Sequence, residues 1–232
     1  MRKIGILGGT FNPPHMAHLN MARAAITEGG MDEVIWIPNG DPPHKKPEIS
    51  ADDRLMMTKL AAADEERMSV SDIEISRPGR SYMAETLELL SAEHPDDKLF
   101  LICGEDMLAG LASWYRAAKI FELADILAFR RENGSSEKNG SSGEASFEVI
   151  FEAGIDQTAA FLERHGARVH VMKTVLPDIS STALRAALAV TNGSGGRSKR
   201  IPELRTLIPE TVLCYIIENR LYQGRQENHR VE

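Results

Sequence analysis

Short apolar runs alternate with segments of helical periodicity along most of the chain. Six runs have the length and the aliphatic content of buried strands, and they span residues 3–8, 33–38, 67–75, 98–103, 125–130 and 168–173. Segments with apolar residues at helical spacing lie between them, at 15–29, 50–66, 82–93 and 104–114. Strands that alternate with helices predict right-handed crossovers and a doubly wound α/β fold, whose mostly parallel sheet carries helices on both faces.

Two internal segments and the tail depart from this alternation. Residues 131–146 and 191–200 are rich in Gly, Ser and Asn, and we expect flexible insertions there. The last apolar stretch starts with Pro209, which is typical of a helix N-terminus, and its apolar residues share one helical face: Val212, Leu213, Ile216, Ile217 and Leu221. We therefore predict one domain over residues 1–223, ending in a helical segment, and a polar tail at 224–232.

Composition and charge exclude some classes of function. The 232 residues carry 27 Lys and Arg against 34 Asp and Glu, a formal net charge of −7, which argues against a nucleic-acid partner. No apolar stretch reaches the length of a transmembrane helix, so no membrane partner is expected, and the N-terminal apolar run is too short for a signal peptide. Cys103 and Cys214 lie in apolar runs, where we expect buried, reduced thiols. The prediction is a cytoplasmic protein, and the sequence leaves open whether it forms a homo-oligomer.

The segment after the first predicted strand, GGTFNPPHMAH, carries the clearest chemistry. Gly8 and Gly9 allow a tight turn and a close approach of the backbone to an anion, and Thr10 adds a hydroxyl. His15 and His18 are three residues apart and share one face of the helix that follows. Because ligands of open α/β sheets bind beyond the carboxyl ends of the strands, we expect these imidazoles to donate to phosphates. A zinc site and a purely structural pair are the alternatives, and the first lacks the Glu of H-E-x-x-H and an evident third ligand.

The same segment resembles the T/H-x-x-H signature of the nucleotidylyltransferase superfamily, with Ala17 where the middle residue is usually Gly. Further segments resemble the nicotinate-nucleotide adenylyltransferases, in that family's order and as far as about residue 223: WIPNGDPPHKKP, RPGRSYMAETL, GEDMLAGLASW, ISSTALR and IPETVLCYIIENRLY. Met83 and Glu85 replace that family's usual Thr and Asp. The resemblance implies a Rossmann-like fold. It also implies adenylyl transfer from ATP to nicotinate mononucleotide, which gives deamido-NAD and pyrophosphate in NAD biosynthesis.

The resemblance also implies roles for single residues. The expected catalytic residues are Thr10, His15, His18 and Arg185, with His18 on the α-phosphate and His15 on the departing phosphates. The residues expected to bind ATP are Gly8, Gly9, Thr10, Phe11, His18, Gly104, Asp106, Arg130, Ile179, Ser180, Ser181, Thr182 and Arg185. Those expected to bind the mononucleotide are Asn39, His44, Lys45, Tyr82, Thr86 and Trp114.

Residue chemistry supports several of these roles and leaves structural alternatives open. Hydroxyls at a helix start, followed by Arg185, suit phosphate oxygens, but an ordinary cap beside a surface Arg has the same sequence. Lys45 suits a phosphate or is a solvated lysine. Trp114 suits a pyridine ring or is a core residue, and Asp106 suits a ribose hydroxyl or the start of a helix.

Two arginines are left without a firm assignment. Arg130 ends the fifth predicted strand near the expected adenine site, but its neighbour Arg131 is an equal candidate. Arg54 lies on the second predicted helix and is either close to the mononucleotide or a surface residue.

The expected chemistry needs no covalent enzyme intermediate. A phosphate nucleophile is already ionised near neutral pH, so direct in-line attack with stabilisation of the phosphate charge is sufficient. Mg²⁺ is expected to bind through the ATP phosphates and keep several waters, with no dedicated metal site in the protein. Nicotinamide mononucleotide or another phosphate ester is the alternative acceptor, and a sensor that binds nucleotides without turnover is the non-enzymatic alternative.

Overall fold

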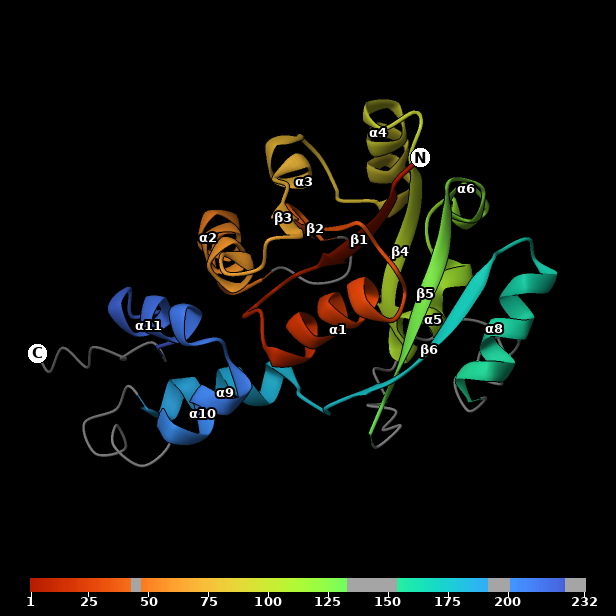
Figure 1. Cartoon of the computed structure of the whole chain (residues 1–232). Helices are drawn as coiled ribbons and strands as arrows, with labels where there is room; N and C mark the ends of the chain where they lie inside the picture. Colours follow the sequence, from red (N-terminus) through yellow and green to blue (C-terminus); the bar gives the residue numbers. More distant parts are fainter. Residues whose placement is uncertain (43–46, 133–153, 192–200, 224–232) are drawn as a thin grey trace, which may run out of the picture.

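The computed structural model describes residues 1–42, 47–132, 154–191 and 201–223. Within them, six strands form one parallel sheet in the order β3-β2-β1-β4-β5-β6. The strands are β1 (Lys3–Gly9), β2 (Glu33–Pro38), β3 (Met68–Val70), β4 (Lys98–Gly104), β5 (Ala124–Arg131) and β6 (Val169–Leu176). This is the Rossmann order, in which the winding reverses between β1 and β4. The predicted fold class is confirmed (Figure 1).

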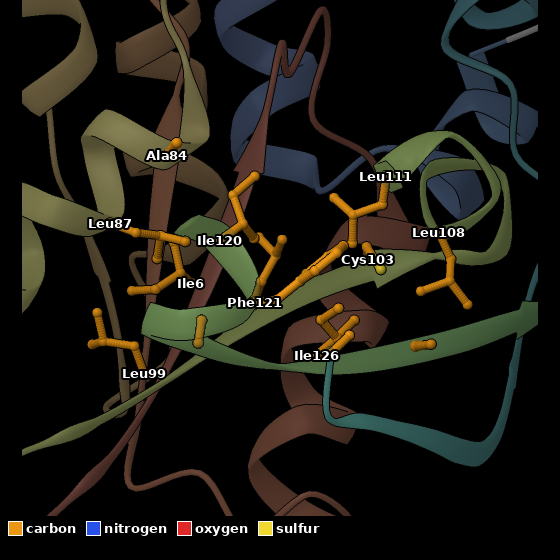
Figure 2. Close-up of a cluster of buried hydrophobic side chains, with 14 of the residues drawn as sticks. Ile6, Ala84, Leu87, Leu99, Cys103, Leu108, Leu111, Ile120, Phe121 and Ile126 are labelled. Atoms are coloured by element: carbon orange, nitrogen blue, oxygen red, sulfur yellow. The ribbon is translucent and has the colours of Figure 1, made fainter. Parts of the chain in front are cut away.

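Helices cover both faces of the sheet because buried side chains alternate along the strands. On β4, Leu99 and Leu101 belong to one apolar cluster, whereas Phe100 and Ile102 belong to another. The first cluster packs against α4 (Met83–Glu93), α5 (Glu105–Gly110), the 3₁₀ turn η1 (Leu111–Ser113), α6 (Ala117–Leu123) and α8 (Ile155–Arg164). Figure 2 shows this layer around Ile120. The second cluster packs against α1 (Met16–Thr27).

A third apolar cluster joins the C-terminal helices to the rest of the molecule. It contains side chains from α2 (Ala51–Ala62), α9 (Ser181–Thr191), α10 (Ile201–Leu207) and α11 (Glu210–Glu218), together with Ala17 of α1. In Figure 1 the blue helices α9, α10 and α11 gather beside the start of α1. The predicted C-terminal helical segment is therefore present, and it packs where the segment with the two histidines enters its helix.

The third predicted strand is shorter in the structure than in the prediction. Only Met68–Val70 pairs with the sheet, at its edge, and the prediction of a strand over 67–75 is wrong beyond that point. The chain instead turns into the short helix α3 (Ile73–Ser76). The carbonyl of Asp72 accepts hydrogen bonds from the backbone N–H groups of Ile75 and Ser76, both at 2.8 Å, and these bonds form the helical turn.

The prediction of buried thiols is right for Cys103 and wrong for Cys214, which is exposed. Helix α11 buries Val212, Leu213 and Ile216. Cys214 follows Val212 by two residues, about 200° around the helix axis, and therefore lies on the opposite face. Ile217, one turn further, is exposed for the same reason, so the predicted apolar face is narrower than the sequence suggests.

Some predictions fall largely or wholly outside the described residues. The insertion predicted at 131–146 is described only at its first two residues, that at 191–200 only at Thr191, and the tail at 224–232 not at all. Among the described residues, no helix is both long and apolar enough to cross a membrane.

Candidate active site

A cavity of about 340 Å³ opens where the winding of the sheet reverses. Residues that follow β1 and β4, the first turns of α1 and α9, and the ends of β5 and β6 line it. The lining residues are Leu7, Gly8, Gly9, Thr10, Phe11, Asn12, His15, Ala17, His18, Met21, Pro47, Glu48, Gly104, Asp106, Met107, Arg131, Leu176, Ser181, Thr182 and Arg185. Ligands of doubly wound sheets bind at this location.

The loop after β1 is held in place from three sides. Phe11 has a positive φ of 47° and is buried, with its ring 5.1 Å from that of His18 and 5.2 Å from that of Trp36. The backbone carbonyl of Asn12 accepts a hydrogen bond from Arg185 at 3.0 Å, and its side-chain oxygen accepts one from the Tyr222 hydroxyl at 2.6 Å. The C-terminal helices therefore fix the loop that carries Thr10.

His15 and His18 form a stacked pair at the start of α1. Their ring centroids are 3.7 Å apart with an interplanar angle of 27°. The backbone N–H of His15 donates to Nδ1 of His18 at 3.2 Å, so a neutral His18 ring carries its proton on Nε2. Nδ1 of His15 is buried and has no hydrogen-bond partner among the described residues.

Both imidazoles are neutral near pH 7. Burial, with a smaller contribution from the Arg131 charge, lowers the pKa of His18 to about 3. Burial, then the neighbouring His18 and Arg131, holds the pKa of His15 well below its usual range. Each ring therefore offers one N–H donor without a formal charge, and a bound polyphosphate would raise both pKa values by its negative charge.

Of the two adjacent arginines at the end of β5, Arg131 lines the cavity and Arg130 does not. Nε of Arg131 lies 3.3 Å from a carboxylate oxygen of Asp106, and Nη1 lies 3.8 Å from one of Asp178. Arg130 points toward α8, where it contacts Asp156 at 2.7 Å. Asp106 is exposed at the cavity and pairs with a cation there before any ligand is present.

The segment that precedes and begins α9 divides between two cavities. Ser181, Thr182 and Arg185 line the cavity beside the histidines, and Arg185 also donates to the Thr182 hydroxyl at 3.2 Å. Ile179 and Ser180 line a separate cavity of about 250 Å³ between α9 and α10.

Four of the residues expected to bind the mononucleotide are described, and they lie outside the lining of the histidine cavity. The hydroxyl of Thr86 is buried and donates to Glu74 at 2.6 Å, and the ring of Tyr82 lies 4.5 Å from that of Tyr115. Trp114 is half-buried at the end of η1, and the backbone N–H of Asn39 donates to Gly9 at 3.0 Å. The remaining two, His44 and Lys45, lie outside the described residues.

Several residues of this region escape sequence reasoning. Arg131 could have been found from strand alternation, because it shares a strand face with Leu127 and Phe129, which pack toward α1. The other lining residues without a sequence signal are Leu7, Asn12, Met21, Pro47, Glu48, Met107 and Leu176. Among the described residues, no group of three or more His, Cys, Asp or Glu is placed to hold a metal ion.

Comparisons with known proteins place the chain in a family. The cytidylyltransferase-like family matches residues 6–187. A relative from Geobacter sp. (strain M21) is 41% identical over 228 residues, which cover 95% of this chain and 98% of the relative. A relative from Synechococcus sp. (strain JA-3-3Ab) is 39% identical over 224 residues, which cover 95% of each chain. Both carry the name "Probable nicotinate-nucleotide adenylyltransferase".

Solved structures share the fold. Nicotinic acid mononucleotide adenylyltransferase from Plasmodium falciparum, complexed with NaAD, superposes with a TM-score of 0.68 at 17% identity, covering 96% of this chain and 98% of that one. The same protein complexed with APC gives a TM-score of 0.67 at 16% identity.

Proposed function

The chain belongs to the nicotinate-nucleotide adenylyltransferases, and we infer from this premise that it transfers the adenylyl group of ATP to nicotinate mononucleotide. The products are deamido-NAD and pyrophosphate, in NAD biosynthesis. The observation that carries the proposal is the stacked pair His15 and His18, two neutral donors at the point where the sheet reverses its winding. We expect the reaction to take place in the cytoplasm, where ATP is available.

The transfer needs positioned donors and no protein nucleophile. An oxygen of the mononucleotide phosphate attacks the α-phosphorus of ATP, and the bond from that phosphorus to the bridging oxygen of the β-phosphate breaks. The electron pair leaves with pyrophosphate. Because the second pKa of a phosphate monoester is about 6, the nucleophile is largely ionised at pH 7 and no side chain has to remove a proton. Catalysis then consists of alignment and of stabilising charge on the phosphates.

The donor positions suggest how this charge is stabilised. We assign Nε2–H of His18 to the α-phosphate and His15 to the departing phosphates. Thr10 and Arg185, which line the same cavity, assist. Arg131 joins this set in place of Arg130, since its guanidinium lies in the cavity and that of Arg130 is turned toward Asp156.

The remaining ATP contacts come from both sides of the reversal point. Gly8, Gly9, Phe11, Gly104, Asp106, Ser181 and Thr182 line the cavity and are proposed to bind ATP. Ile179 and Ser180 immediately precede α9, and we retain them as candidates for the nucleoside part. A Cβ at Gly104 would make only ordinary contacts, 3.8 Å from Cε of Met21 and 3.9 Å from Nε of Arg131, so space alone does not require glycine there.

Mg²⁺ is proposed to enter with ATP. Hard oxygen ligands suit this ion, it keeps several waters, and phosphate oxygens supply the ligands that the protein does not. When bound, Mg²⁺ neutralises part of the charge on the departing phosphates. Among the described residues, the carboxylates that line the cavity are Glu48 and Asp106, and Asp106 is paired with Arg131.

The acceptor is proposed to bind on the adjacent side, along Asn39, Tyr82, Thr86 and Trp114, with His44 and Lys45. Since the Thr86 hydroxyl is buried against Glu74, we expect Thr86 to contact the pyridine substituent through its backbone, and Trp114 to stack on the ring. Nicotinamide mononucleotide is the alternative acceptor, because backbone donors decide between the acid and the amide.

The test is pyrophosphate release with ATP and Mg²⁺, comparing nicotinate mononucleotide, nicotinamide mononucleotide and phosphopantetheine. We expect release with the acid mononucleotide and its loss in His18→Ala. Release that is faster with the amide would change the acceptor. A protein whose melting temperature rises with ATP, but which releases pyrophosphate with none of the three, would be a sensor and would refute the proposal.

A further inference from the structure

Arg54 of α2 is a buried cation that pairs with no carboxylate among the described residues. Its side chain is on the inside of α2 and the residue is 1% exposed. Its hydrogen-bond partners are oxygens of neutral groups: the carbonyls of Thr10 at 3.0 Å, Asn39 at 2.6 Å and Gly40 at 3.1 Å. Nε has no partner among the described residues, and burial lowers the pKa of the guanidinium. A buried unpaired charge is costly, so stability alone is a poor explanation for an arginine here.

The three carbonyls belong to two loops: Thr10 follows β1, and Asn39 and Gly40 follow β2. The ladder between β1 and β2 ends at Gly9 and Pro38, and one more bond follows, from the Asn39 N–H to the Gly9 carbonyl at 3.0 Å. Beyond it, the carbonyls of Thr10 and Asn39 converge, and two acceptors cannot bond to each other. One guanidinium nitrogen of Arg54, Nη1, donates to both. Arg54 thus continues the connection between the loops past the end of the sheet.

The second loop is also fixed from its other side. The Gly40 N–H donates to the Ser81 hydroxyl at 2.9 Å, and the Ser81 N–H donates to the Asp41 carbonyl at 2.9 Å. A Cβ at residue 40 would lie 2.3 Å from the backbone oxygen of Glu74, so only glycine fits. Ser81 directly precedes Tyr82 on the acceptor side. The Asn39–Asp41 loop is therefore held between the loop after β1 that carries Thr10, here called the phosphate loop, and Ser81 on the acceptor side. Arg54 sets its distance from the phosphate loop.

We propose that Arg54 is a positioning residue that fixes the acceptor loop, Asn39–Asp41, against the phosphate loop at Thr10, and so sets the separation between the attacking phosphate and the α-phosphate. Its catalytic consequence rests on the proposed function. A misplacement of about 1 Å between reacting groups can lower a rate by about 10²-fold. The guanidinium is suited to this task because its planar fork reaches two loops at once, which a single ammonium group cannot do.

The test compares Arg54→Lys and Arg54→Met with Lys59→Met, an exposed lysine on the same helix. For Arg54→Lys we expect a kcat that is about tenfold to a hundredfold lower, an ATP KM within about threefold of the original, and a melting temperature close to that of the parent protein. A kcat equal to that of Lys59→Met would overturn the proposal. Loss of folding in both Arg54 variants, or parallel loss of kcat and ATP binding, would also overturn it, because Arg54 would then act on stability or on ATP alone.

A second readout does not need turnover. Hydrogen–deuterium exchange of the amides of Asn39 and Gly40 should accelerate in both Arg54 variants and stay unchanged in Lys59→Met. Unchanged exchange in a protein that makes deamido-NAD would refute the positioning role and leave the proposed function intact. Accelerated exchange in a protein that releases no pyrophosphate would support the positioning role of Arg54 and refute the proposed function.

Discussion

The two ends of the sheet handle buried charge in opposite ways. At the carboxyl ends of the strands, Arg54 is buried against neutral carbonyls and the two histidines are held neutral. At the amino ends, the buried carboxylate of Asp125 contacts three side chains: Lys98 at 2.6 Å, the imidazole of His170 at 3.0 Å, and Arg168. Among the described residues, Arg54 has no carboxylate partner at one end of the sheet, while at the other end a single carboxylate has three side-chain partners.

This difference separates function from stability. The two neutral histidines can donate to a polyphosphate without first breaking an ion pair, whereas Arg131 has to leave Asp106 to do so. The amino end contributes no residue to the cavity beside the histidines. Its ion pairs connect β4, β5 and the segment before β6. We therefore expect them to stabilise the fold and to leave kcat unchanged.

The largest expected effect is a loss of kcat in His18→Ala, at the carboxyl end of the sheet. The variant removes a donor that we assign to the α-phosphate, and loss of one such donor typically costs about 10²–10³ in kcat. The fold should persist, since the ring is partly exposed at the cavity. Steady-state pyrophosphate release, with circular dichroism to verify folding, measures this. A kcat within threefold of the original would remove His18 from the mechanism.

Asp125→Asn should have the complementary effect, a loss of stability with kcat unchanged. The three partners of Asp125 are 38%, 48% and 53% exposed, so solvent weakens these contacts, and we expect the free energy of unfolding to fall by about 1–2 kcal/mol at pH 7. Chemical denaturation gives this value. A lowered kcat at full folding would show that the two ends of the sheet are not independent.

The same variant carries a pH signature. Burial raises the pKa of Asp125, but hydrogen bonds from Lys98, His170 and Arg168 outweigh it and leave the pKa below its usual value. A carboxyl whose pKa is lower in the folded state stabilises the fold above the pKa of the unfolded chain, about 3.9. That stability is lost as the pH falls through the folded-state pKa. The difference between parent and variant should therefore be full at pH 7 and shrink below about pH 4.

The smallest expected effect is a difference in the KM for ATP between variants of the adjacent Arg130 and Arg131. Arg131→Met should raise the KM for ATP about tenfold, since a guanidinium that lines the cavity is lost. Arg130→Met should leave it within twofold, because that side chain is paired with the exposed Asp156 on the outside of the sheet. ATP titrations of the two variants decide this. Equal effects would mean that both arginines reach the nucleotide.

The sequence predicts the parts of this molecule that depend on local pattern. Alternating strands and helices predicted the doubly wound, mostly parallel sheet, and the turn followed by His15 and His18 was placed at the correct end of it. The error at residues 67–75 arose because an edge strand can end wherever a turn competes with it. Here the turn is formed by hydrogen bonds to the carbonyl and the carboxylate of Asp72, and these bonds do not follow from hydrophobic spacing.

The candidate site is predictable only in part, because burial of a charged residue depends on distant loops. From sequence, Arg54 is equally well a surface residue, since nothing in its helix shows that the carbonyls of Thr10 and Asn39 converge on it. Arg131 differs. Its strand face follows from the alternation along β5, so the choice between it and Arg130 was within reach of the sequence.

The hydrogen bond from Tyr222 to Asn12 joins residues 210 positions apart in the chain. A ribosome that has made the glycine turn and both histidines has still not made the residue that anchors the loop between them. This hydrogen bond can therefore form only when almost the entire described chain has been synthesised. Fragments released early by interrupted translation would carry the histidine motif without this hydrogen bond to the loop that precedes it.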